Sequence, residues 1–296
     1  MIEMIESLFS RQVRDWPLLA KGVKGLARAQ TRQVRVGWFD VFVRHIPHRA
    51  ASTTAAVDPE SVAKRPCFLC AGNLPPQQEG VAFDEHFAIY CNPFPIVDRH
   101  LTIIHREHRA QRIAGQFGKM LELAAALPGY FVVYNGPQCG ASAPDHMHFQ
   151  AGSRILFPIA NDTAALGGIT VPDYARNVLV FRGGDRSELV EMMDRAIALL
   201  AANNDHGPEP MVNIAVYHEG GRWVVYLFPR AKHRPQVFYT GALTVSPASI
   251  DLCGIFVAPL ASDFEKITGE MIAAIFREVT LPDNLFWEIA ARLESR

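Results

Sequence analysis

Two histidines and a glutamine alternate at positions 146, 148 and 150 of the chain. Alternate side chains of an extended strand point the same way, so His146, His148 and Gln150 would share one face. Met147 and Phe149 would then point to the other face, pack in the core and fix the strand in place. Two imidazoles and an amide on a rigid strand suit phosphorus chemistry, in which one histidine attacks and the amide holds a phosphate oxygen.

The segment just before this strand contains a glycine-bearing turn that can hold a phosphate. Gly140 and Ser142 form a Gly-x-Ser sequence, and Asn135 begins the segment. Backbone N–H groups of such a turn bind anions, and short polar side chains can reach an α-phosphate. Ordinary surface or core histidines are the alternative interpretation. A lone histidine would favour it, but the alternating set behind Gly-x-Ser favours function.

Cys67 and Cys70 form a Cys-x-x-Cys pair, the spacing of a metal knuckle. Two thiolates at this spacing bind zinc when two further ligands are present. A redox pair is one alternative, but no thioredoxin-like strand and helix surround the motif. A pair of buried thiols is another. The spacing favours zinc over both.

Basic residues after the last predicted hairpin are candidates for phosphate binding. Arg230, His233 and Arg234 could bind phosphates bidentately, or they could form a solvated basic turn. Both alternatives stay open on the residues alone. Arg49 and Arg65, which flank an irregular connection, are weaker candidates.

Hydrophobic periodicity predicts strands and helices around these residues. The predicted strands cover residues 34–45, as a strand or a hairpin, and 87–91, 100–105, 130–134, 147–152, 177–181, 211–218 and 222–228. Helices are predicted over 116–127, 187–203 with Ser187 as the cap, 263–278 and 282–296, and an irregular connection over 47–66. Strand, helix and hairpin follow one another twice, which indicates a weak duplication whose second copy lacks His-x-His-x-Gln.

Composition limits the class of protein. The chain has 296 residues, of which 49% are apolar and 20% charged, as in soluble globular proteins. A net charge of -1 gives no reason to expect nucleic acid or an anionic membrane as partner. The least polar stretch, 241–260, is interrupted by Pro247, Asp251 and Pro259, which argues against a membrane span. No signal-peptide pattern is present, and an odd count of five cysteines fits a reducing cytoplasm.

Several short strings together resemble the transferase branch of the histidine triad superfamily. They are His-x-His-x-Gln behind Gly-x-Ser, Asn-Pro-Phe-Pro at 92–95, His-Leu-Thr-Ile-Ile at 100–104 and Arg-Glu-His at 106–108. The branch includes galactose-1-phosphate uridylyltransferase, diadenosine tetraphosphate phosphorylase and GDP-L-galactose phosphorylase. Residues 145–151 and Tyr-Leu-Phe-Pro-Arg at 226–230 are most similar to the last of these. One extra residue between Ser142 and His146 departs from the uridylyltransferases.

The resemblance, which covers roughly residues 67–234, implies an α+β fold of antiparallel sheets with helices. Two pseudo-duplicated halves would pack as one body, a catalytic half over 1–160 and a degenerate half over 161–296. His148 would be the nucleophile that forms a covalent nucleotidyl intermediate, assisted by Gln150 and Ser142. Gln150 replaces the third histidine of the hydrolase branch. A glutamine cannot act as a general acid, so the intermediate would wait for a phosphorylated acceptor rather than water.

The resemblance also implies a ligand set. His108 and His146 would complete a structural zinc site with Cys67 and Cys70, and His105 is the alternative third ligand. Four protein ligands leave no open position on the metal, so the zinc would be structural. The expected substrate-binding residues are Asn135, Gly140, Asn92, Arg230 and Arg234.

The expected activity is phosphorolysis of a nucleoside diphosphate hexose. Two enzyme alternatives remain, namely adenylyl transfer from a dinucleoside tetraphosphate and uridylyl exchange between hexose phosphates. A non-catalytic nucleotide-binding sensor is an alternative of another class. The expected partners are a nucleotide sugar or dinucleotide and phosphate, without nucleic acid or membrane, and a homodimer is one assembly the sequence allows.

Overall fold

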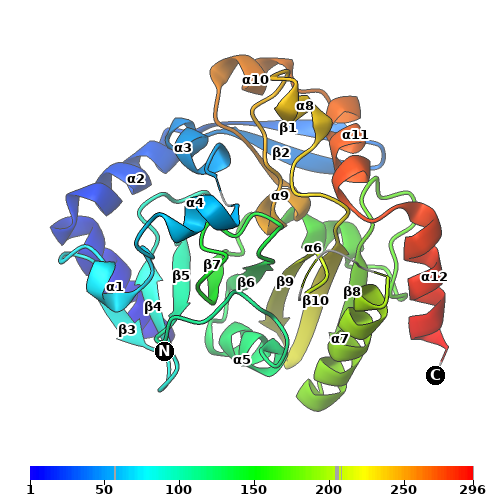
Figure 1. Cartoon of the computed structure of the whole chain (residues 1–296), viewed down its shortest axis with the longest axis horizontal. Coiled ribbons are helices and arrows are strands. Elements are labelled where there is room, and N and C mark those ends of the chain that lie inside the picture. The colour runs from blue at the N-terminus through cyan, green and yellow to red at the C-terminus, as the bar shows by residue number, and fades with distance from the viewer. Residues whose placement is uncertain (57, 204–206, 208, 296) are drawn as a thin grey trace.

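An eight-stranded antiparallel sheet crosses the whole molecule (Figure 1). The computed structural model describes residues 1–56, 58–203, 207 and 209–295. In spatial order the strands are β3 (Gly80–Ala82), β4 (Phe87–Cys91), β5 (Leu101–His105), β7 (His148–Ser153), β6 (Tyr130–Asn135), β9 (Val212–Glu219), β10 (Arg222–Pro229) and β8 (Leu179–Gly183). The fold is α+β, as expected.

The order of the central strands has an internal two-fold pattern. The sequence β5-β7-β6 on one side of the sheet is mirrored by β8-β10-β9 on the other, and β6 pairs with β9 at the junction. Helix α5 (Phe117–Ala126) follows β5, and α7 (Arg186–Ala201) follows β8. The strand, helix and hairpin order is therefore present twice. The division at residue 160 stays a prediction, because the sheet runs without a break between the halves.

Two hydrophobic cores cover the two faces of this sheet. On one face pack α1 (Ile2–Asp15), α2 (Pro17–Ala27), α5, α7 and α12 (Asp283–Glu294). On the other face lie a small sheet, β1 (Gln30–Val36), β2 (Phe39–His45) and β11 (Ile255–Ala258), and helix α11 (Gly269–Val279). Met147 and Phe149 belong to the first core, as expected. By strand alternation His148 and Gln150 face the second side, toward the small sheet.

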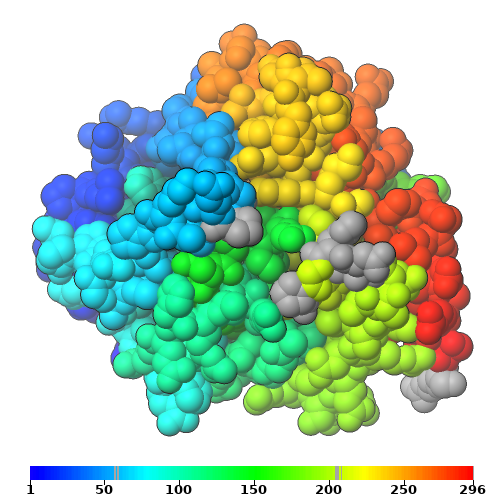
Figure 2. Space-filling view, in the orientation of Figure 1, coloured from blue at the N-terminus to red at the C-terminus, as the bar shows by residue number. Residues whose placement is uncertain are grey.

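Short helices complete the chain and gather largely around the second side. They are η1 (Pro47–Arg49), α3 (Ala50–Thr53), α4 (Pro59–Ala63), η2 (Ala71–Asn73), α6 (Pro158–Thr163), α8 (Gln236–Tyr239), α9 (Ser249–Leu252) and α10 (Ala261–Lys266). In Figure 2 the segment near residues 50–65 (blue) and the segment near residue 240 (yellow) lie beside green atoms from the middle of the chain.

Most predicted elements are confirmed, and three differ. The connection at 47–66 contains the short helices η1, α3 and α4 rather than irregular chain alone. The helix predicted over 263–278 is two helices, because Thr268 caps a new one by accepting from Met271 N–H. Gly269 lies so close to the carbonyl oxygen of Arg35 that a Cβ would be 1.9 Å away from it. Arg296, the end of the last predicted helix, lies outside the described residues.

The apolar stretch 241–260 contains α9 and β11, and no helix in the described part of the chain has the length and apolarity that crossing a membrane requires.

The third difference concerns the start of α7. The sequence predicts Ser187 as the cap, but the carboxylate of Asp185 accepts hydrogen bonds from the N–H groups of Ser187 and Glu188, at 2.8 and 3.0 Å. We predict that Asp185→Ala lowers the free energy of unfolding by about 1 kcal/mol, whereas Ser187→Ala changes it little. Urea denaturation of the two variants measures the difference. Equal losses, or a larger loss for Ser187→Ala, would contradict the assignment of the cap.

Candidate active site

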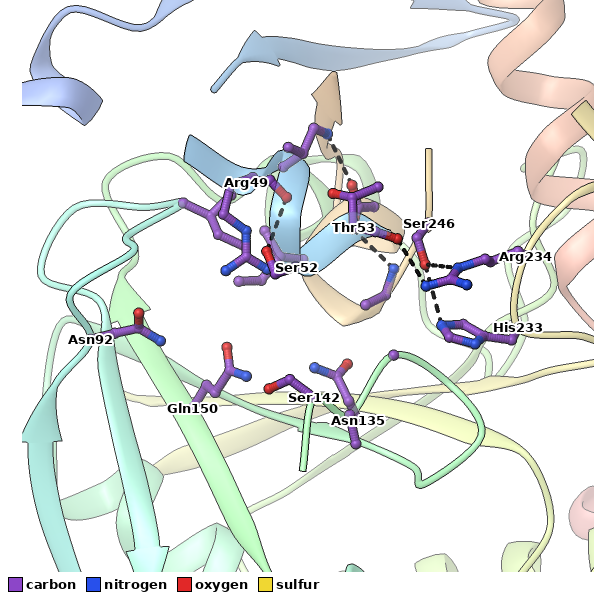
Figure 3. A pocket seen from close by; sticks show the side chains of 17 residues that line it. Arg49, Ser52, Thr53, Asn92, Asn135, Ser142, Gln150, His233, Arg234 and Ser246 are labelled. Atoms are coloured by element: carbon purple, nitrogen blue, oxygen red, sulfur yellow. Dashed lines mark hydrogen bonds between the residues drawn. The ribbon is translucent and has the colours of Figure 1, made fainter. Parts of the chain in front are cut away.

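A polar cavity lies on the face of the main sheet that carries Gln150 (Figure 3). Three groups of side chains labelled in the close-up form its wall. The floor comes from the sheet and the loop after β6, the roof from η1 and α3, and one side from the C-terminal half. The groups are Asn135, Ser142 and Gln150 for the floor, Arg49, Ser52 and Thr53 for the roof, and His233, Arg234 and Ser246 for the side.

His148 carries its proton on Nδ1. That nitrogen lies 2.8 Å from the backbone oxygen of His146, which can only accept, so Nε2 keeps its lone pair. Burial lowers the pKa of His148 to about 4, so the ring is neutral near pH 7. The side chain is 2% exposed and does not itself contribute to the cavity wall. Gln150, about 7 Å further along the same strand face, does.

The backbone of the nucleophile candidate is fixed by Gln111. The side-chain oxygen of Gln111 accepts from the N–H of His148 at 2.8 Å, and its amide nitrogen donates to the carbonyl of His148 at 3.0 Å. The same amide donates to the carbonyl of Asn135 at 2.9 Å. Gln111 therefore clamps β7 to the end of β6. No pattern in the sequence singles it out.

A buried histidine orients the amide of Gln150. The N–H of Ile96 donates to Nδ1 of His100 at 3.2 Å, so His100 carries its proton on Nε2 and donates it to Oε1 of Gln150 at 2.9 Å. Burial lowers the pKa of His100 to about 3. With its oxygen occupied, Gln150 is left with its two amide N–H groups as the free donors. The only sequence signal for His100 is its place in the string at 100–104.

Asn135 is oriented in the same way by the C-terminal half. Its Oδ1 accepts from Nδ2 of Asn213 at 2.8 Å and from the N–H of Ser249 at 3.0 Å, which leaves its own amide N–H groups as donors. Ser142 lies between Asn135 and Gln150 on the floor (Figure 3). Gly140 has φ +95°, and a Cβ there would lie 2.8 Å from that of Ala248. The floor thus presents hydrogen-bond donors, as an anion requires.

Four potential metal ligands meet beside this floor. The ligand atoms of Cys67, Cys70, His108 and His146 all lie within 4.8 Å of one another. Each cysteine sulfur is 3.2 Å from a histidine Nδ1, Cys67 from His146 and Cys70 from His108. Tetrahedral zinc with these ligands has edges of roughly 3.3 to 3.8 Å, so the cluster is close to the geometry of a bound ion.

The geometry separates His105 and His108, the two candidates for the third metal ligand. Nε2 of His146 donates to the backbone oxygen of His105 at 2.7 Å, so Nδ1 of His146 faces the cysteines with its lone pair. The ring of His105 lies elsewhere, with Nδ1 at 3.1 Å from both the N–H and the carbonyl of Glu107. His108, and not His105, belongs to the cluster.

The arginines predicted for phosphate binding have different roles. Arg230 is 4% exposed, and its five N–H donors all point to acceptors of the protein. These acceptors are Oδ1 of Asn213 and the carbonyls of Val279, Pro247, Lys232 and His233. Arg230 also lies outside the cavity wall. The expectation that it binds an incoming phosphate is therefore wrong, because no donor remains.

Three other predicted residues form hydrogen bonds that hold neighbouring segments of the protein in place. Arg234 lines the cavity, but it donates to Ser246 Oγ and to the carbonyls of Thr53 and Ala55. Asn92 also lines it, with its amide nitrogen on Thr102 Oγ1 and its oxygen accepting from the N–H of Phe94. Arg65 donates to the carbonyl of Ser142 at 2.9 Å and so supports the loop from outside.

Comparisons with known proteins agree with this geometry. Residues 158–294 match the family described as GDPGP1-like, C-terminal domain, and residues 8–153 match a domain of unknown function, DUF4922. The crystal structure of yeast Ap4A phosphorylase Apa2 superposes with a TM-score of 0.62 at 18% identity, over 93% of this chain and 97% of that chain. This chain therefore shares the fold of that yeast enzyme.

The same yeast enzyme in complex with Ap4A superposes on this chain with a TM-score of 0.56 at 16% identity. That match covers 93% of this chain and 97% of the yeast chain. No curated protein sequence matches the chain. Identities this low establish the fold and leave the substrate to be argued from the site.

The buried neutral histidines predict a pH-dependent stability. His100 and His148 have pKa values of about 3 and about 4 in the fold, against 6.5 ordinarily. Below pH 6.5 the unfolded chain takes up protons that the folded chain does not, so stability falls as pH falls from 6.5 toward 4. Each histidine contributes about 1.4 kcal/mol per pH unit to the slope. Urea unfolding between pH 7 and 4.5 should show a shallower slope for His100→Asn than for the wild type. Identical slopes would contradict the prediction.

Proposed function

We propose that the protein is a nucleotidyltransferase that phosphorolyses a nucleoside diphosphate sugar through a nucleotidyl intermediate on His148. One observation carries the proposal, namely a neutral His148 with a free Nε2 lone pair beside a floor of hydrogen-bond donors. The fold shared with an Ap4A phosphorylase and the GDPGP1-like C-terminal domain support it. The match to the latter favours a nucleoside diphosphate hexose.

In the first step, the lone pair on Nε2 of His148 forms a bond to the α-phosphorus. The bond from that phosphorus to the bridging oxygen breaks, and hexose 1-phosphate leaves with the electron pair. The carbonyl of His146 stabilises the positive charge on the ring through Nδ1–H. The donors of Asn135, Ser142 and Gln150 stabilise the charge on the phosphoryl oxygens.

In the second step, an oxygen of inorganic phosphate attacks the same phosphorus. The N–P bond breaks, its electron pair returns to Nε2, and a nucleoside diphosphate is released. The amide of Gln150 cannot act as a general acid or base toward water, and its oxygen is occupied by His100. We therefore expect the intermediate to persist until a phosphate-bearing acceptor arrives.

We further propose that Cys67, Cys70, His108 and His146 hold one structural zinc ion. Two thiolates and two imidazoles are a donor set that zinc prefers, and the four atoms are close enough for one ion. When bound, the ion supplies rigidity rather than chemistry. The ligand His146 also supplies the carbonyl that holds Nδ1 of His148, so the site would fix the orientation of the nucleophile.

Phosphorolysis of a dinucleoside tetraphosphate is the second candidate, because the fold matches a yeast Ap4A phosphorylase over almost the full length of both chains. The chemistry at His148 is the same, and only the leaving group differs. Uridylyl exchange and the non-catalytic sensor remain alternatives that the next experiment tests.

The wild type should convert one donor from a panel of nucleotide sugars and dinucleotides only when inorganic phosphate or a sugar phosphate is present. Mass spectrometry after acid-free quenching should show a nucleotidyl adduct on the peptide containing His148. His148→Ala should lower the rate by at least about 10³-fold with little change in stability, because the nucleophile is lost. His86→Ala, at an exposed histidine, serves as the control. Near wild-type turnover by His148→Ala would refute the mechanism. Rapid hydrolysis by the wild type without an acceptor would indicate a hydrolase. Nucleotide binding by the wild type without an adduct would favour the sensor.

Protein purified without added metal should contain about one zinc per chain, measured by plasma mass spectrometry. Cys67→Ser should lose the metal and lower the melting temperature, because the remaining three ligands bind it weakly. Cys91→Ser removes a buried cysteine outside the cluster and should keep the metal. Metal-free wild type, or equal metal content in both variants, would overturn the assignment.

A further inference from the structure

Arg49 occupies the roof of the cavity, across from Gln150 on the floor (Figure 3). It is the last residue of η1, in the connection between β2 and α4. Its guanidinium has one hydrogen bond among the described residues, a long one of 3.4 Å from NH1 to the carbonyl of Phe94. Burial lowers its pKa to about 10, which leaves it a cation at neutral pH.

Arg230 and Arg234 form more hydrogen bonds to protein acceptors than Arg49 does. Arg230 uses all five of its donors on protein acceptors, and Arg234 donates to three. Arg49 retains four N–H groups with no hydrogen-bond acceptor within the part of the chain that the structure describes. A half-buried guanidinium with unused donors on a cavity wall can form bidentate hydrogen bonds to an anion.

The carboxylate that acts on Arg49, that of Asp251, is already hydrogen-bonded within the protein. Among the described residues that line the cavity, Asp251 is the only acid. Its two oxygens accept from the N–H groups of Ala248 and Val257, both at 2.9 Å, and so hold α9 and β11 together. Burial raises the pKa of Asp251 to about 6, so the carboxylate is still largely ionised at neutral pH and attracts Arg49, although no hydrogen bond joins the two among the described residues. The guanidinium of Arg49 therefore keeps donors for an anion.

We propose that Arg49 binds a phosphate group on the side of the α-phosphorus opposite His148. The phosphate of the leaving group departs from that side, and the incoming phosphate attacks from it. The proposal rests on the proposed function. In phosphoryl transfer the attacking and leaving oxygens lie roughly in line, on opposite sides of phosphorus. His148 shares the strand face of the floor residue Gln150, and Arg49 lies across the cavity from Gln150. The β-phosphate of the donor and the inorganic phosphate acceptor then use the same subsite, which Arg49 supplies in place of Arg230.

The decisive experiment uses the full-length protein and separates the two half-reactions. The nucleotidyl adduct is isolated by desalting, and its discharge is followed against the concentration of inorganic phosphate. In Arg49→Gln the phosphate concentration for half-maximal discharge should rise roughly 10- to 100-fold. Slow hydrolysis of the adduct in phosphate-free buffer should stay unchanged. Arg49→Lys keeps the positive charge but loses the planar pair of N–H donors. Its phosphate concentration for half-maximal discharge should lie between those of the wild type and Arg49→Gln.

Arg222→Gln, at an exposed arginine on the β9–β10 hairpin, is the matched control and should behave as the wild type. Phosphorus-31 line broadening of inorganic phosphate gives a readout without turnover, and it should be strong for the wild type and weak for Arg49→Gln. Equal discharge curves, or equal broadening, for the wild type and Arg49→Gln would overturn the subsite. If the wild type formed no adduct, the proposed function would fail, while the line-broadening result would still decide whether Arg49 binds phosphate.

Discussion

The site depends on three hydrogen-bonding or ligand positions of one residue, His146. Its Nδ1 faces the sulfurs of Cys67 and Cys70, its Nε2 donates to the backbone of β5 at His105, and its carbonyl accepts from Nδ1 of His148. A single imidazole thus connects the cysteine knuckle, the neighbouring strand and the nucleophile candidate. Any change that rotates His146 would alter the position of His148, because a hydrogen bond of 2.8 Å joins them directly.

The C-terminal half contributes to the site although it lacks His-x-His-x-Gln. Asn213 and Ser249 set the orientation of Asn135, and the guanidinium of Arg230 bonds in turn to Asn213. Because buried polar groups are costly unless every donor and acceptor is paired, this network is specified jointly by both halves. The pairing of β6 with β9 brings its members together. The second half therefore supports the loop after β6 and forms one wall of the cavity.

Local patterns predicted the parts of the site that depend on neighbours in sequence. Strand alternation gave the shared face of His148 and Gln150, and the cysteine spacing gave half of the metal cluster. Non-local contacts were beyond such patterns. Arg230 looks like a phosphate ligand until its acceptors, which come from distant segments, are known. Arg49 lies in a stretch with no periodicity, where a sequence gives no indication of which cavity a side chain enters.

The protons of three buried histidines occupy different nitrogens. His148 is protonated on Nδ1, whereas His146, two residues earlier on the same face, and His100 are protonated on Nε2. Each assignment is imposed by a backbone or amide partner that can act only as donor or only as acceptor. Moving the proton of His148 to its other nitrogen would cost a buried hydrogen bond and block the lone pair without displacing a single heavy atom. The readiness of His148 for the proposed attack on phosphorus thus depends on its tautomer, a property of proton positions and not of the shape of the chain.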